Sequence, residues 1–116
     1  MDIGLPKVSR YSDFWPIYLR EHSRPGTRYV HYAGTTAGLA CIPLALAFRN
    51  LWFLPVGIVA AYGAAWTAHA LIEKNKPATF QYFAWSLASD FRMLWFALTG
   101  RLGGELRRCG VGPGRG

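Results

Sequence analysis

The chain contains three histidines, His22, His31 and His69, and these are the side chains best suited to bind a metal ion. Imidazole nitrogens are common metal ligands, and together with a carboxylate such as that of Glu73, four residues after His69, and open coordination positions they suit non-haem Fe(II). Zn(II) and Mn(II) accept similar ligands, so the residue types alone leave the metal open. For any one of these histidines, a hydrogen-bonded position at a helix end is the simpler interpretation. A metal site requires that the fold bring all three together.

Two long segments without charged side chains indicate how this happens. They run from Tyr32 to Phe48 and from Leu51 to Ile72. A helix that spans a membrane needs roughly 20 apolar residues, with a range of about 17–25, and both segments fall within that range. The sequence therefore predicts a helical hairpin of two spans that turns near Arg49 and Asn50. The alternative is a soluble helical hairpin buried inside an oligomer.

The predicted hairpin places two of the histidines at the same depth. The stretch of chain from His31 to Arg49 is almost as long as the stretch from Asn50 to His69. At about 1.5 Å per residue, both histidines lie roughly 28 Å from the turn. His22 precedes His31 by nine residues, which is enough for a turn to bring it back to the same end. We therefore expect all three imidazoles at the open end of the hairpin.

Small residues line one face of each predicted span. Gly34 and Gly38 are four residues apart in the first, and Ala61 and Ala65 are four apart in the second. Such pairs allow two helix backbones to approach closely in lipid. On a helical wheel each of these faces ends at a histidine, which favours a tight hairpin with a common site at its mouth.

The composition agrees with a membrane protein and excludes other classes. Hydrophobic residues make up 52% of the chain and charged residues 16%, which does not fit a disordered protein and fits poorly with a soluble globule. The net charge is +7, and nearly all basic residues flank the predicted hairpin, so the positive-inside rule places both termini in the cytoplasm. We expect no nucleic-acid partner, because the basic residues belong to no known nucleic-acid-binding motif.

The remaining segments are predicted to flank the hairpin. An interfacial helix is expected over Ser12–His22, followed by a turn at Ser23–Thr27 and, after the hairpin, a polar loop at Glu73–Thr79. A further helix within Phe80–Thr99 is expected to lie at the interface or against the hairpin mouth, because charged residues sit near its middle. We therefore expect one all-α, membrane-embedded domain over residues 1–105 and a flexible Gly/Arg-rich tail over residues 106–116.

Several sequence segments together resemble the small membrane family typified by the yeast 2-hydroxy fatty acid dioxygenase. The resemblance covers roughly residues 11–105. The segments that carry it are Phe14–His22, Arg28–Thr35, Ala65–His69, Glu73–Phe80, Trp85–Leu87 and Asp90–Met93.

The resemblance implies an Fe(II)-dependent dioxygenase. Its family histidines correspond to His22, His31 and His69, which would be the iron ligands. Glu73, four residues after His69, would then be a fourth ligand or an acceptor that orients a ring N–H. Arg28 or Arg24 would pair with the carboxylate of the substrate, and the alternative is that both only hold lipid headgroups.

The implied reaction shortens a 2-hydroxy fatty acid by one carbon with dioxygen. The acyl tail would enter the membrane beside aromatic side chains such as Trp66, Phe80 and Trp85. Membrane lipid is a further expected partner, and a two-span hairpin is compatible with a homodimer. The competing interpretation is a membrane scaffold or lipid-binding protein without catalysis, and a small transporter ranks last because the spans carry few polar residues.

Overall fold

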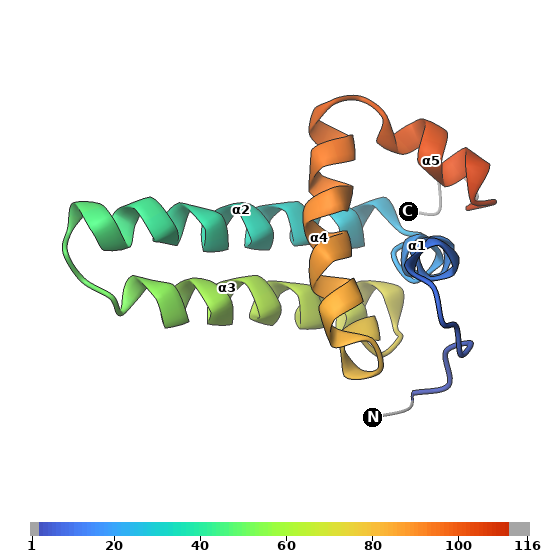
Figure 1. Ribbon diagram of the computed structural model, residues 1–116, viewed down its shortest axis with the longest axis horizontal. Helices are drawn as coiled ribbons and strands as arrows, with labels where there is room; N and C mark the ends of the chain where they lie inside the picture. Colours follow the sequence, from blue (N-terminus) through green and yellow to red (C-terminus); the bar gives the residue numbers. More distant parts are fainter. Residues whose placement is uncertain (1–2, 112–116) are drawn as a thin grey trace.

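Two long antiparallel helices form the frame of the molecule (Figure 1). The computed structural model describes residues 3–111, which form helices and loops and no strand. Helix α2 (Pro25–Ala47) pairs with α3 (Phe53–Ala68), and a π-helical turn, η1 (His69–Glu73), continues α3. By length and composition, the segments 25–47 and 53–73 are each able to cross a membrane. The predicted all-α hairpin is confirmed.

The hairpin turns where the sequence predicts. Arg49 adopts a left-handed conformation with φ 50°, and the N–H of Asn50 donates to the carbonyl of Ala45 at 3.0 Å. The N–H of Arg49 donates to the carbonyl of Leu46 at 3.3 Å, which completes a Schellman motif. The carbonyl groups of Ala45 and Leu46, near the end of α2, are thus satisfied before the chain reverses.

Helix α2 begins at Pro25, inside the segment that the sequence analysis assigned to a turn. Proline is favoured in the first helical turn, because its missing N–H would have no partner there and its φ is already helical. The connection from α1 to α2 is therefore only a few residues long, and it keeps His22 close to the start of α2.

Glycines allow the two long helices to approach closely. A Cβ atom built on Gly34 would lie 2.8 Å from the Cβ of Ala64, and one built on Gly57 would lie 2.8 Å from the Cβ of Cys41. Real Cβ atoms do not tolerate such contacts, so both positions require glycine in this packing. The small-residue faces that the sequence analysis identified form this contact.

The outer surface of the hairpin is apolar. Leu46, Leu51 and Trp52, around the turn, are each about three-quarters exposed. Contiguous apolar surface of this kind is unfavourable in water and marks a region that contacts lipid or another protein. It supports an environment of low polarity around the hairpin.

The other helices gather at the end of the hairpin away from the turn (Figure 1). They are α1 (Tyr11–Arg20), α4 (Phe83–Leu98) and α5 (Leu102–Arg108), and the short 3-10 helix η2 (Ala78–Phe80) precedes α4. Helix α4 crosses both long helices, in agreement with the expectation that residues 80–99 lie against the hairpin mouth.

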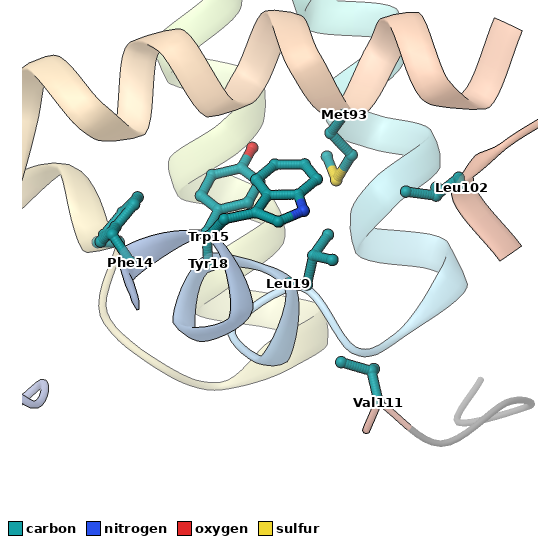
Figure 2. Packing of buried hydrophobic residues seen from close by; sticks show 8 residues of the cluster. Phe14, Trp15, Tyr18, Leu19, Met93, Leu102 and Val111 are labelled. Carbon is teal, nitrogen blue, oxygen red and sulfur yellow. The ribbon is translucent and has the colours of Figure 1, made fainter. Parts of the chain in front are cut away.

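The main hydrophobic core lies between α1, α4 and α5 (Figure 2). Phe14, Trp15 and Tyr18 are at most 1% exposed, and Met93 and Leu102 cover them from α4 and α5. From the sequence we expected the apolar face of the first helix to lie on the membrane surface. In the structure that face is buried inside the protein, because α4 and α5 fold over it.

The boundary expected between residues 105 and 106 falls inside helix α5. Beyond this helix, Val111 is buried in the core. The end of the expected tail, residues 112–116, lies outside the described residues.

We expect Glu105→Gln to weaken the attachment of α5 to the core. Glu105 accepts hydrogen bonds from Arg108 and from Trp15 Nε1 at 2.9 Å, and the Arg108 guanidinium lowers the pKa of Glu105 to about 2. The stabilisation is thus complete above pH 4.5 and is lost as the pH falls towards 2. The variant should lose about 1 kcal/mol at pH 7 and show a flatter acid dependence in thermal denaturation. Asp13→Asn, which breaks an exposed pair with Arg10, is the control and should change little.

Candidate metal centre

The structure brings the three histidines together at the open end of the hairpin. His22 follows α1, His31 lies in α2, and His69 opens the π-helical turn after α3. The Nε2 atom of His22 lies 3.1 Å from those of both His31 and His69, and the latter two are 3.4 Å apart. All three side chains are buried, with at most 4% of their surface exposed. They are the only group of three potential ligand side chains among residues 3–111 that could hold a metal ion.

The triangle of Nε2 atoms has the size that a metal ion requires. A histidine nitrogen binds a metal such as zinc at about 2.0–2.1 Å, so two ligands lie about 2.9 Å apart at a right angle and about 3.4 Å apart at the tetrahedral angle. The observed separations fall within this interval. Three ligands on one face of an ion leave its other positions open for further ligands.

The Nδ1 atoms point away from the centre, and their hydrogen bonds determine which tautomer each ring adopts. His22 Nδ1 donates to the carbonyl of Tyr18 at 2.7 Å, and His69 Nδ1 donates to Asn75 Oδ1 at 2.6 Å. A ring that donates from Nδ1 in its neutral form carries a lone pair at Nε2. The lone pairs of His22 and His69 therefore point at the same small space, where a cation would remove their repulsion.

The Nδ1 atom of His31 makes a weaker contact than the Nδ1 atoms of His22 and His69. Its Nδ1 lies 3.5 Å from Asp90 Oδ1, too far for a good hydrogen bond but close enough for electrostatic attraction. Asp90 itself accepts a hydrogen bond of 2.5 Å from the Tyr18 hydroxyl. This network favours the N–H of His31 at Nδ1, which again leaves Nε2 free to bind a metal.

Burial favours the neutral form of His22. It lowers the pKa of His22 well below the ordinary value, and the nearby rings of His31 and His69 lower it further. A metal ligand must be a neutral imidazole, so no proton has to be removed from this ring before a metal binds at neutral pH.

The π-helical turn and Asn75 position His69. The turn ends at Lys74, which has a left-handed φ of 61°, and the backbone N–H of Asn75 then donates to the carbonyl of His69 at 3.0 Å. The side-chain amide of Asn75 also donates to the carbonyl of Glu21 at 3.2 Å. Asn75 therefore links the end of α3 to the end of α1, where His22 lies.

Glu73 and Arg28 lie beside the centre but bond elsewhere. Glu73, expected as a fourth ligand or ring acceptor, accepts hydrogen bonds from the hydroxyl of Ser23 and the backbone N–H of Arg24. Arg28, expected to face a substrate carboxylate, donates to the carbonyls of His22 and Ser23 at 2.8 and 2.9 Å. Both side chains fix the turn between α1 and α2. The role of ring acceptor that we expected of Glu73 belongs to Asn75 in the structure.

Asn75→Ala is expected to weaken metal binding by about 10–100-fold, the usual effect of removing a group that orients a metal ligand. The variant removes both the acceptor for His69 and the link to Glu21, while no ligand is lost. Metal affinity is measured by competition with a chelator. Asn50→Ala, which removes the same side chain at the hairpin turn, is the control and should retain the affinity of the unaltered protein. Equal affinities for the two variants would contradict the positioning role of Asn75.

The fold and the site define a class of protein: a small helical protein with a hairpin able to span a membrane and a buried three-histidine centre at its open end. The chain belongs to the Mpo1-like family, whose model, described as 2-hydroxy-palmitic acid dioxygenase Mpo1-like, matches residues 8–102. This confirms the resemblance found in the sequence. No curated protein and no solved structure matches the chain significantly.

Proposed function

We propose that this protein is a membrane-bound, Fe(II)-dependent dioxygenase that shortens 2-hydroxy fatty acids by one carbon. The observation that carries the proposal is the convergence of three buried Nε2 atoms within 3.4 Å of one another, where hydrogen bonds at Nδ1 turn the Nε2 lone pairs of His22 and His69 inward. The family description supplies the class of reaction and the substrate class. Neutral imidazoles with open positions beside them suit non-haem iron.

The overall reaction requires no further reductant. A 2-hydroxy acid and one dioxygen give the acid that is one carbon shorter, one carbon dioxide and one water. The bond between the first and second carbons breaks, and the substrate loses the four electrons that dioxygen gains. Bound iron would supply the redox chemistry with dioxygen. The protein has to hold the ion, position the hydroxyl and carboxylate groups of the substrate beside it, and exclude water.

The residues around the centre suit these tasks. His22, His31 and His69 would hold the ion, while Asn75 and the carbonyl of Tyr18 keep two of the rings in place. The hydrophobic core of α1 and α4 lies directly against the site, since Tyr18 stacks on His22 with ring centroids 4.1 Å apart. Such packing limits the access of water and fixes the ligand geometry.

We propose that the hairpin is embedded in the membrane with its open end, and both chain termini, on the cytoplasmic side. The exposed apolar surface of α2 and α3 supports the embedding. The orientation rests on the basic residues, because Arg49 is the only one in the turn and the others flank the hairpin. The metal centre would then lie near the cytoplasmic surface, where an amphipathic fatty acid presents its polar end.

Incubation of the iron-loaded, detergent-purified protein with 2-hydroxypalmitate and oxygen tests the reaction. We expect mass spectrometry to show the acid one carbon shorter, with one carbon dioxide per dioxygen consumed. Palmitate, which lacks the hydroxyl group, should remain unchanged, as should 2-hydroxypalmitate with the metal-stripped protein. A fully iron-loaded protein that yields no shortened acid would refute the proposed reaction and favour a lipid-binding or scaffold role.

A further inference from the structure

A groove of about 380 Å³ runs along the hairpin from the metal centre towards the turn. Its walls come from α2 and α3, and residues of α4 border it at the histidine end. His31 and Asp90 lie at that end, whereas Ile42 and Leu54 lie at the other. Its volume lies within the range of about 300–1,000 Å³ that is typical of small-molecule sites.

The close approach of the helices explains the groove. The glycines at positions 38 and 57 lie where α2 and α3 touch, since a Cβ on Gly38 would come within 3.0 Å of the carbonyl oxygen of Gly57. Both glycines also line the groove, together with Ala61 and Ala65. Because these four residues have small side chains or none, a channel remains between the helices. Larger residues, such as Leu39 and Ile58, border the open side of this channel.

The groove is polar only near the metal centre. His31 and Asp90 are its only ionisable imidazole and carboxylate groups, and its far end is lined by aliphatic side chains. Tyr62 also lines it, and its hydroxyl group is buried without a hydrogen-bond partner among the described residues. An unpaired buried hydroxyl is costly, so this group favours a bound molecule that brings an oxygen atom.

The length of the groove matches a long acyl chain. His31 and Ile42 are eleven residues apart on one helix, which corresponds to about 16 Å at 1.5 Å per residue. An extended hydrocarbon advances about 1.25 Å per carbon, given a C–C bond of about 1.5 Å and an angle of about 111°, so this distance holds about 13 carbons.

We propose that this groove binds the acyl chain of the 2-hydroxy acid, with its methyl end against Ile42 and Leu54, so that these two residues set the preferred chain length. The inference rests on the proposed function for the identity of the head group at the metal centre. It differs from the expectation that the tail lies beside Trp66, Phe80 and Trp85. None of these three lines the groove: Phe80 packs on Trp66, and Trp85 packs on Phe14 and Tyr82.

The open side of the groove provides a route of entry. Ile42 is half exposed and Ile58 is 59% exposed, so the channel faces the medium that surrounds the hairpin. In a bilayer a fatty acid could move sideways from the lipid into the groove. Because lipid tails are as apolar as the groove, selection among chains would come from the fit of their length rather than from hydrophobicity.

Photolabelling locates the methyl end directly. The probe is a 2-hydroxy acid of sixteen carbons with a diazirine near its methyl end, bound without oxygen to the iron-loaded protein in lipid nanodiscs, so that no turnover occurs. We expect labels on the peptides that contain Ile42 and Leu54, and their displacement by excess 2-hydroxypalmitate. Labels on the peptides with Trp66, Phe80 or Trp85, or labels spread over all exposed apolar residues and not displaced, would overturn the proposal.

Substitutions at the far end test the control of length. In anaerobic competition by 2-hydroxy acids of ten to twenty carbons, Leu54→Phe should shorten the preferred chain by about two to four carbons, because each carbon takes about 1.25 Å. Leu46→Phe, the same change at an exposed position of α2 outside the groove, is the control and should leave the preference unaltered. An equal preference in both variants would refute the inference.

These experiments separate the inference from the proposed function. Labelling and competition are measured without turnover, so a probe that labels the far end of the groove supports the acyl site even if no shortened acid forms on admission of oxygen. Conversely, oxidation of the acid with labels elsewhere supports the reaction and overturns the groove. Ile42→Phe provides a second, independent variant at the same end of the groove.

Discussion

Replacing His31 with alanine is expected to abolish stable iron binding and, with it, all oxidation of 2-hydroxy acids. His31 lies in α2 and borders both the other two rings and the groove. Its loss leaves two imidazoles, and we expect the affinity for iron to fall by more than the roughly 100-fold that loss of an orienting group causes. Iron content after anaerobic reconstitution and desalting should fall from about one per chain to below a tenth.

The same result is expected for His22→Ala and His69→Ala, because all three Nε2 atoms lie at similar distances from one another, between 3.1 and 3.4 Å. Tyr29→Ala is the control: it lies two residues before His31, is 69% exposed, and should keep full iron content. Circular dichroism of each variant checks that the helices persist. Iron that stays stoichiometric in all three histidine variants would show that the metal is bound elsewhere and would end the proposed function.

The hairpin and the meeting of its histidines could be predicted from the sequence because both depend on local patterns. Two charge-free segments, each long enough to span a membrane, fix two long helices, and a single polar turn between them fixes their antiparallel pairing. Once the helices are antiparallel, nearly equal distances from the turn place His31 and His69 at one level. The small residues on the same helical face as each histidine indicated which sides of the two helices are in contact.

The residues that hydrogen-bond to the histidine ligands could not be predicted in this way. Asn75 follows His69 by six residues, and in a regular helix that spacing puts two side chains on different faces. Only the π-helical turn and the left-handed Lys74 bring Asn75 back to His69. Glu73 occupies the helical position that suggested a ligand, but the same turn directs it to Ser23 and Arg24.

The burial of the apolar face of the first helix inside the protein was missed for a related reason. An amphipathic helix with aromatic residues is equally compatible with a membrane surface and with a protein core, since both are apolar. The packing of α4 and α5 decides between them, and it depends on contacts distant in the sequence, such as that of Trp15 with Glu105. The charged residues of α4 were the only feature of the sequence that indicated this packing. Asp90 and Arg92 favoured a position of α4 outside the membrane core, and both have partners in the fold. Asp90 accepts a hydrogen bond from Tyr18, and Arg92 lies over the Trp15 ring.

Gly34→Leu is expected to separate the two long helices at the level of the metal centre. Gly34 lies one turn from His31, and even a single Cβ there would be 2.8 Å from the Cβ of Ala64 and 3.2 Å from the carbonyl oxygen of Ala61. Neither neighbour has a flexible end that can move aside. Overpacking of this kind costs about 1–3 kcal/mol, and a leucine should reach the upper end of that range.

Gly63→Leu is the matched control. A Cβ at Gly63 meets nothing within 4 Å, so the same change on α3 adds an apolar side chain to an open surface and should not lower the thermal stability. Near-equal melting temperatures of the two variants in detergent would contradict the tight α2–α3 contact.

The same pair of variants connects packing with metal binding. The Nε2 atoms of His31 and His69 are 3.4 Å apart, close to the upper limit of about 3.4 Å for two ligands of one ion at the tetrahedral angle. Separation of α2 from α3 by even a few tenths of an ångström therefore widens this pair beyond the tetrahedral separation and weakens its grip on a common ion. We expect Gly34→Leu to lose iron at temperatures where its helices remain intact, and Gly63→Leu to keep it. Iron retained by a destabilised Gly34→Leu would show that the histidines are held by α1 and η1 rather than by the contact between the two spans.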